Sequence, residues 1–237
     1  MSRSVGVYQK WLDETVSDIV SRGKTPSLLL HACCAPCSSY CVEYLSEFFN
    51  ITVFFYNPNI DSVTEYERRV REEERFLSAF PAKRAVSLVS EKYGPEVFFE
   101  ETKGLYDEPE GGKRCEKCFR LRLEKTAAYA KEKGFDYFTT TLSISPLKDA
   151  VLLNTIGDEL SKKYGVPYLF SEFKKRGGFL RSTELSKEYK LYRQDYCGCV
   201  FSKRERAKQK EKEKDNEVTD DGTGISGSLG RQVSERN

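Results

Sequence analysis

Eight cysteines carry most of the chemistry that this sequence can perform, and they lie in three groups. The groups are Cys33, Cys34, Cys37 and Cys41, then Cys115 and Cys118, then Cys197 and Cys199. Thiolates bind soft metals and iron–sulfur clusters, and paired thiols carry redox chemistry. Isolated core cysteines have no reason to adopt the spacings CC, CxxC and CxC. The grouping therefore predicts a metal or redox centre.

The start of the chain is polar and charged, and no apolar run follows it. We therefore expect neither a signal peptide nor a membrane-spanning helix, and the expected location is cytoplasmic. Thiols in the cytoplasm stay reduced unless they bind metal or act in catalysis. The 39 basic and 37 acidic residues nearly cancel, which argues against a strongly basic nucleic-acid-binding domain. Any contact with RNA must come from a local patch.

Apolar patterns along the chain predict strands that alternate with helices. The expected strands are residues 27–31, 51–56, 85–89, 135–140 and 166–170. The expected helices cover 8–20, 34–49, 62–80, 97–102 and 118–134, and a further helix runs to Gly165 from Ser145 and Pro146 as N-cap and first residue. This alternation implies an α/β fold with a parallel, doubly wound sheet, which binds ligands outside the carboxyl ends of its strands.

Two parts of the chain differ in composition. We expect a single α/β domain over residues 1–202 and a disordered charged tail over 203–237, because the tail has almost nothing to bury. We also predict that this tail is dispensable for the chemistry.

The first cysteine group follows the first expected strand, where dinucleotide-binding folds carry a glycine-rich phosphate loop. No GxGxxG stands there, so the expected ligand is a metal cluster, which the helix N-terminus would stabilise. We expect Cys33 and Cys34, as sequence neighbours, to point apart, so that they need not serve the same iron. Cys37 and Cys41 lie at i and i+4 on one helix face. For Cys41, a core position and a ligand role both remain open.

The other two groups add chelating pairs. Cys115 and Cys118 have the CxxC spacing that binds zinc or an iron–sulfur cluster, and the glycine between Cys197 and Cys199 lets both sulfurs point inward, to chelate or to form a disulfide. Three groups exceed the four ligands of one structural zinc, which favours an iron–sulfur cluster with a second metal or dithiol. His31 is expected to be a core residue or to contact the metal ligands without binding the metal itself. The CxxxCxxC motif of radical-SAM enzymes is absent.

Five long motifs resemble those of the QueH-type epoxyqueuosine reductases: LHACCAPCSSY, FFYNPNI, DEPEGGKRCEKCFRLRLEKTA, FDYFTTTLSISPLK and LYRQDYCGCVFS. The resemblance runs from about residue 8 to residue 203. It implies a Rossmann-like metalloenzyme domain and an oxidoreductase of queuosine biosynthesis, which removes the epoxide oxygen of epoxyqueuosine at the tRNA wobble position. It also implies a [4Fe-4S] cluster, a second iron or redox-active dithiol, and two partners, the tRNA anticodon loop and an electron donor.

The resemblance further implies roles for individual residues. Cys33, Cys34, Cys115 and Cys118 are the expected cluster ligands, and Cys197 and Cys199 are the expected catalytic redox pair or second-metal ligands. Asp13, in the opening YQKWLD, is a candidate ligand of the second iron and a candidate catalytic residue.

Substrate binding needs groups for the base and for the phosphates. We expect base contacts from Tyr56, Asn57, Thr141, Ser143 and Lys148, which follow the ends of strands. Positive charge for the phosphates is expected from Lys174, Lys175, Arg176 and Arg181. Asp195, Tyr196 and Ser143 are unranked candidates for the proton donor.

Two other functions remain open from the sequence. One is a tRNA thiolase whose cluster delivers sulfur, although that chemistry normally needs nucleotide activation and the phosphate loop is missing. The other is a zinc-stabilised RNA-binding protein. Colour separates the second from an iron–sulfur protein, because the zinc protein is colourless.

Overall fold

Alternating strands and helices account for most of residues 6–220, the part of the chain that our computed structural model describes, with side chains described up to Glu213. The strands are β1 (Ser27–His31), β2 (Asn50–Phe55), β3 (Val86–Ser90) and β4 (Tyr137–Thr140). The helices are α1 (Val7–Ser21), α2 (Ala35–Leu45), α3 (Val63–Ala79), α4 (Glu96–Glu101), α5 (Lys113–Lys133), α6 (Ala150–Tyr164), α7 (Gly178–Glu188) and α8 (Val200–Asp220), and η1 (Thr141–Ile144) is a short 3-10 helix.

The four strands form one parallel sheet in the order β3-β2-β1-β4. His31 pairs with Phe54 on one side and with Thr140 on the other, so the carboxyl ends of these three strands share one edge. The chain leaves β1 toward β2 on one side, and β4 joins β1 on the other. This reversal between β1 and β4 is where a doubly wound sheet binds its ligand, and it confirms the predicted fold class.

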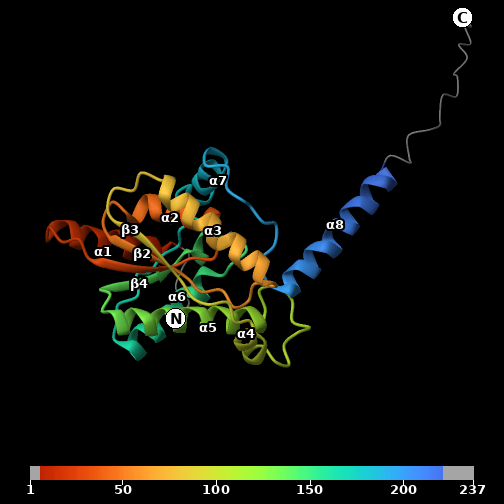
Figure 1. The fold of residues 1–237 in the computed structure, drawn as a ribbon, viewed down its shortest axis with the longest axis horizontal. Helices are drawn as coiled ribbons and strands as arrows, with labels where there is room; N and C mark the ends of the chain where they lie inside the picture. The colour runs from red at the N-terminus through yellow and green to blue at the C-terminus, as the bar shows by residue number, and fades with distance from the viewer. Residues whose placement is uncertain (1–5, 221–237) are drawn as a thin grey trace, which may run out of the picture.

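Side chains of β1 alternate between two cores, one on each face of the sheet. Leu28 and Leu30 pack with α1, α2 and α3, whereas Leu29 packs with α5 and α6. Figure 1 shows these helices in two layers with the sheet between them. Among the described residues, no helix is long and apolar enough to cross a membrane.

Two predicted elements are wrong in detail. The strand expected over 166–170 is reduced to a single parallel bridge between Phe138 and Tyr168, because Pro167 has no N–H group to donate to a ladder. The helix expected from Ser145 begins at Ala150 instead, since the Asp149 carboxylate accepts hydrogen bonds from the N–H groups of residues 151 and 152.

The C-terminal segment also differs from the expectation. Helix α7 was not predicted, and α8 continues to Asp220 where the sequence analysis expected disorder from residue 203. The lysine and glutamate content of this segment favours a helix once its start is anchored. In Figure 1, α8 projects away from the body of the protein. The part of the predicted tail over 221–237 lies outside the described residues.

Candidate metal centre

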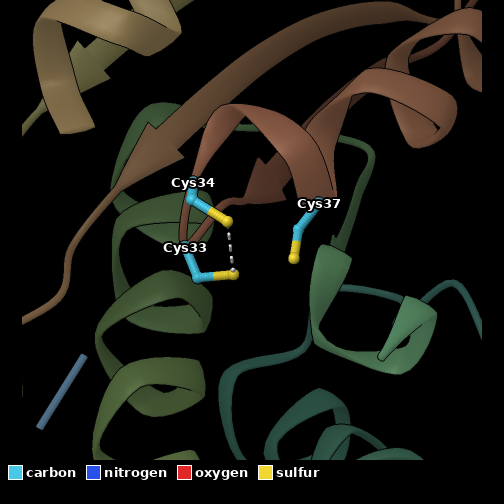
Figure 2. A group of neighbouring side chains, drawn as sticks. All are labelled: Cys33, Cys34 and Cys37. Atoms are coloured by element: carbon cyan, nitrogen blue, oxygen red, sulfur yellow. Dashed lines mark hydrogen bonds between the residues drawn. The ribbon is translucent and has the colours of Figure 1, made fainter. Parts of the chain in front are cut away.

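Three cysteines converge where β1 meets α2. Cys33 follows the strand, Cys34 is the N-cap of α2, and Cys37 lies in its first turn, which Pro36 helps to begin. Their sulfurs all lie within 4.8 Å of one another, and the Cys33 and Cys34 sulfurs are 3.7 Å apart (Figure 2). The prediction that Cys33 and Cys34 point apart is therefore wrong. We call Cys33, Cys34 and Cys37 the thiol triad.

The thiol triad favours a negative charge on one sulfur. Hydrogen bonds from Cys34 and Cys37 hold the pKa of the Cys33 thiol well below its usual value, and the nearby Lys148 and Arg122 act in the same direction. The hydrogen bond with Cys33 raises the pKa of Cys34 to about 12. A Cys33 thiolate that accepts from two thiols is a ready metal ligand, because metals bind the thiolate form.

The sequence analysis left Cys37 out of the proposed ligands and left Cys41 open. The structure places them differently although both lie on α2. Cys37 is half-buried and lines a cavity with the rest of the thiol triad, whereas Cys41 is fully buried in the hydrophobic core and its thiol donates to the Cys37 carbonyl. A core position is the role that the structure supports for Cys41.

Cys197 lines the same cavity, which has a volume of about 610 Å³. The hydrogen bond from Cys199 lowers the pKa of Cys197 well below its usual value, and Lys148 and Arg122 add to the effect. Gly198 between them has φ 125, and a side chain there would meet Arg69 at 3.1 Å, so glycine is required. Arg69 in turn donates to the Cys197 carbonyl at 3.4 Å.

Cys115 and Cys118 lie in the first two turns of α5, outside the thiol triad. Cys118 is buried, packs with Cys199 and Phe201, and has its pKa raised to about 11 by burial. The Cys115 sulfur accepts from the Gly111 N–H at 3.2 Å. Apart from Cys41, the thiols thus form two sets: the thiol triad, which lines the cavity, and the set of Cys115, Cys118, Cys197 and Cys199, of which Cys197 lines it. All eight are free cysteines.

Arg122 is a buried cation that the sequence analysis missed. It is 1% exposed and donates to the Asn57 amide oxygen at 2.5 Å, to His31 Nε2 at 3.3 Å and to the Cys118 sulfur at 3.9 Å. Burial, followed by the charge of Arg122, lowers the pKa of His31 to about 3, so His31 is neutral. Among the described residues Arg122 has no carboxylate partner, and its charge faces the thiols. Its position four residues after Cys118 was the available signal.

The predicted substrate-binding residues are only partly brought to the cavity. Lys148 lines it and is in no ion pair among the described residues, and the Cys197 and Cys33 thiolates raise its pKa against the effect of burial. Thr141 is buried, with its hydroxyl 3.9 Å from the Cys33 sulfur. Ser143 is buried against Ser171.

Asn57 is buried and bridges Arg122 to the carbonyl of residue 32. Tyr56 is half-buried beside Lys125 and does not line the cavity. Of the proton-donor candidates, Asp195 and Tyr196 line the cavity and Ser143 does not.

The structure does not bring Asp13 to the cysteines. Its carboxylate forms a two-point ion pair with Arg176, with a shortest distance of 2.7 Å, and no contact with a thiol occurs among the described residues. A role for Asp13 at a second iron stays a prediction without structural support. That residues 203–237 are dispensable for the chemistry stays a prediction, although Glu205, Arg206 and Gln209 of α8 line the cavity.

One further buried group lies behind α2. Glu73 of α3 is fully buried and accepts a hydrogen bond from Ser38, which follows Cys37 in the sequence. Its second carboxylate oxygen has no hydrogen-bond partner among the residues that the structure describes. Burial raises the pKa of Glu73 to about 8, so this carboxyl is largely protonated at neutral pH.

A doubly wound parallel sheet with the thiol triad in place of the phosphate loop at its switch point defines a Rossmann-like protein whose three grouped thiols could hold a metal. The family model described as "Epoxyqueuosine reductase QueH" matches residues 28–205. The chain belongs to this family, as the resemblance indicated.

Individual relatives support the same family assignment. A protein of Streptococcus pyogenes serotype M1 is 48% identical over 179 residues, which cover 75% of this chain and 70% of the relative. A Staphylococcus epidermidis protein is 43% identical over 199 residues, 82% of this chain and 84% of its own. A Thermotoga maritima protein is 38% identical over 186 residues, which cover 76% of this chain and 92% of the relative. Each is named epoxyqueuosine reductase QueH.

Proposed function

We propose that this protein reduces epoxyqueuosine in tRNA to queuosine, with a [4Fe-4S] cluster held by the thiol triad and by thiols of the second set. The remaining thiols of the second set, which include the CGC pair, hold a second iron or act as a redox-active dithiol. The single observation that carries the proposal is the thiol triad, in a chain that belongs to a family of epoxyqueuosine reductases.

The donor set fits such a cofactor. Iron–sulfur clusters are held by cysteine thiolates, usually four, and four thiols, those of Cys33, Cys34, Cys37 and Cys197, line the cavity. Two cations, Arg122 and Lys148, face these thiols without a carboxylate partner among the described residues. Unpaired buried cations are costly unless negative charge lies nearby. A thiolate-bound cluster supplies that charge.

The reaction consumes two electrons and two protons for each epoxide, and it yields an alkene and one water. When bound, the cluster passes single electrons from an external donor to the site. The chain must therefore hold the base and supply protons to the epoxide oxygen. A cavity of about 610 Å³ is in the range of small-molecule sites and suits one extruded base.

Lys148 is suited to the proton supply. Its ammonium group faces Cys33 and Cys197, whose negative charge keeps it protonated. A protonated amine beside the thiols can donate a hydrogen bond to the epoxide oxygen and then a proton as the carbon–oxygen bond breaks. Tyr196, whose hydroxyl donates to Asp61 at 3.0 Å, stands at the same cavity as a second donor.

An anaerobic assay tests the proposal. Protein reconstituted with iron and sulfide is mixed with tRNA that carries epoxyqueuosine and with a chemical reductant, and the nucleosides are analysed by mass spectrometry. We expect the loss of one oxygen from the modified nucleoside. An unchanged epoxide with iron-loaded protein would refute the reductase, and a gain of sulfur would point to the thiolase instead.

A further inference from the structure

We propose that α8 extends the cavity into a docking surface for the phosphates of the tRNA anticodon stem and loop, through a row of three cations: Arg204, Lys208 and Lys212. This inference rests on the proposed function, because it assigns the binding of the same tRNA substrate to a surface. The row of these three cations is called the α8 row below.

The first turns of α8 belong to the cavity. Glu205, Arg206 and Gln209 line it together with the thiol triad. The helix is anchored there because Glu205 accepts from the buried Arg114, whose guanidinium stacks on Phe201. A nucleotide that enters the cavity must therefore bring its neighbouring phosphates close to α8.

The cations expected to bind these phosphates already have partners, and three of the four are in ion pairs. Arg176 pairs with Asp13 at 2.7 Å, and Lys175 lies 3.9 Å from Glu172. Arg181 pairs with Glu43 at 2.6 Å and with Glu184 at 3.3 Å. The fourth, Lys174, donates to the Lys148 carbonyl. Each exposed pair is weak, but phosphates on this face compete with the carboxylates, so it is a weaker docking surface than a row of cations without ion pairs.

The cations of α8 divide into two kinds. Lys203 pairs with Asp61, Lys210 with Asp195 and Arg206 with Glu213. The three members of the α8 row are exposed, and none of them forms an ion pair with any side chain that the structure describes.

The members of the α8 row are spaced at i, i+4 and i+8. They therefore lie along one side of the helix, with steps of about 6 Å. Three acidic residues lie three positions from a member of the row: Glu205, Glu211 and Asp215. Glu205 is paired with Arg114, so three positive and two negative charges remain along the row. A line of regularly spaced cations that pair with no described side chain, beside a base-sized cavity, is complementary to a nucleic-acid backbone, because phosphate contacts fix the register of a bound strand.

The part of the chain that the family model matches bears on what the α8 row does. The match ends at residue 205, so two of the three members, Lys208 and Lys212, lie beyond the shared part. The body of the protein carries the thiols and the cavity, and α8 adds charge to their rim. We therefore expect the α8 row to change affinity for tRNA and its salt dependence, and not the identity of the reaction.

Binding of an unmodified tRNA transcript with the same anticodon loop, followed by fluorescence anisotropy at several salt concentrations, tests this inference. The test variant of the iron-loaded full chain is Arg204→Gln, Lys208→Gln and Lys212→Gln combined. We expect roughly 10-fold weaker binding at about 0.1 M salt and a slope of log K against log salt that is shallower by about 2. The KM for epoxyqueuosine-containing tRNA should rise in parallel.

A matched control removes the same charge elsewhere. Lys24, Lys83 and Lys131 are exposed and lie ahead of β1, β3 and β4, at the opposite edge of the sheet. Their combined change to Gln should leave both affinity and slope as in the wild type. Equal affinity and slope in the α8 variant, or an equal loss in the control, would overturn the inference. If the proposed function fails, the wild type binds tRNA but leaves the epoxide intact, so the two failures are distinguishable.

Discussion

Replacing Arg122 with glutamine removes the buried charge that faces the thiols, and it should weaken the hold on iron. Arg122 is 1% exposed, and the atom nearest to a thiol, Nη1, lies 3.9 Å from the Cys118 sulfur. Its other partners, Asn57 and His31, are neutral. A glutamine side chain at this position would keep part of the hydrogen bonding and none of the charge, so the change isolates the electrostatic contribution.

The distance sets the size of the effect. Two unit charges 3.9 Å apart interact by about 4 kcal/mol at an effective dielectric constant of about 20, which is an upper limit. One pKa unit corresponds to about 1.4 kcal/mol, so the charge can lower a thiol pKa by up to about 3 units. Burial already raises the pKa of Cys118 to about 11 with Arg122 in place. Without Arg122 this pKa rises further, and iron binding, which needs the thiolate, weakens by up to about 1000-fold.

The assay is iron retention. Wild type and variants are reconstituted anaerobically with iron and sulfide, and the loss of iron to a chelator is followed by absorbance. Arg122→Gln should lose iron fastest, and Arg122→Lys, which keeps the charge but not the planar fork, should lie between it and the wild type. Arg120→Gln is the matched control, because Arg120 is exposed on the same helix and pairs with Glu159. Wild-type iron retention in a folded Arg122→Gln protein would refute the argument.

Three further predictions concern the thiols and the buried carboxyl. Cys37→Ala should lose most of the cluster absorbance and the activity. Cys41→Ala should keep the cluster and lose about 1–2 kcal/mol of stability in a urea titration. Equal iron content in the two variants would contradict the role of the thiol triad as ligands. Cys199→Ser should abolish turnover while it retains part of its iron, and normal single-turnover rates would remove the CGC pair from the mechanism. The wild type should lose about 3 kcal/mol of unfolding free energy between about pH 5.5 and pH 8, because the pKa of Glu73 is raised to about 8 in the folded state and the buried carboxyl ionises as pH rises to that value. Glu73→Gln has no such carboxyl and should gain this amount relative to the wild type over the same range. A difference in urea midpoint that is equal at both pH values would show that Glu73 is not buried as an acid.

The alternating pattern predicted the layers of the fold because the inner strand β1 is buried on both faces and the helices that cover the sheet each bury one side. It failed where two signals of equal strength compete. Ser145 and Asp149 are both good N-cap residues, and the structure uses the second, which caps the helix whose Leu153 and Ile156 pack in the core under the sheet. The run 166–170 is apolar enough for a strand, but the proline inside it restricts pairing to one bridge.

The convergence of the cysteine groups was only partly predictable. Cysteines that follow a strand or begin a helix can be placed at the carboxyl edge of the sheet from topology alone. Cys197 and Cys199 lie in an irregular segment between α7 and α8. The position of such a segment in the fold cannot be predicted from a periodic pattern of apolar residues. The position of these two cysteines depends on Arg69, a buried cation on α3 that donates to the Cys197 carbonyl. Contacts of this kind, between segments far apart in the sequence, cannot be predicted from the spacing of residues along the chain.

Cys37 shows why helix spacing alone misjudged the ligands. Residues at i and i+4 share a helix face, so the spacing alone could not tell which of Cys37 and Cys41 lies at the site. The face that Cys41 presents is covered by the core, with Leu28, Leu30 and Phe76 in the same cluster. The first turn of α2 lies beyond the end of β1, where no strand remains to cover it, and the same face opens there onto the cavity. A helix face therefore changes from core to site along its length when the helix begins past the edge of the sheet, and the N-terminal member of an i, i+4 pair is the one to test as a ligand.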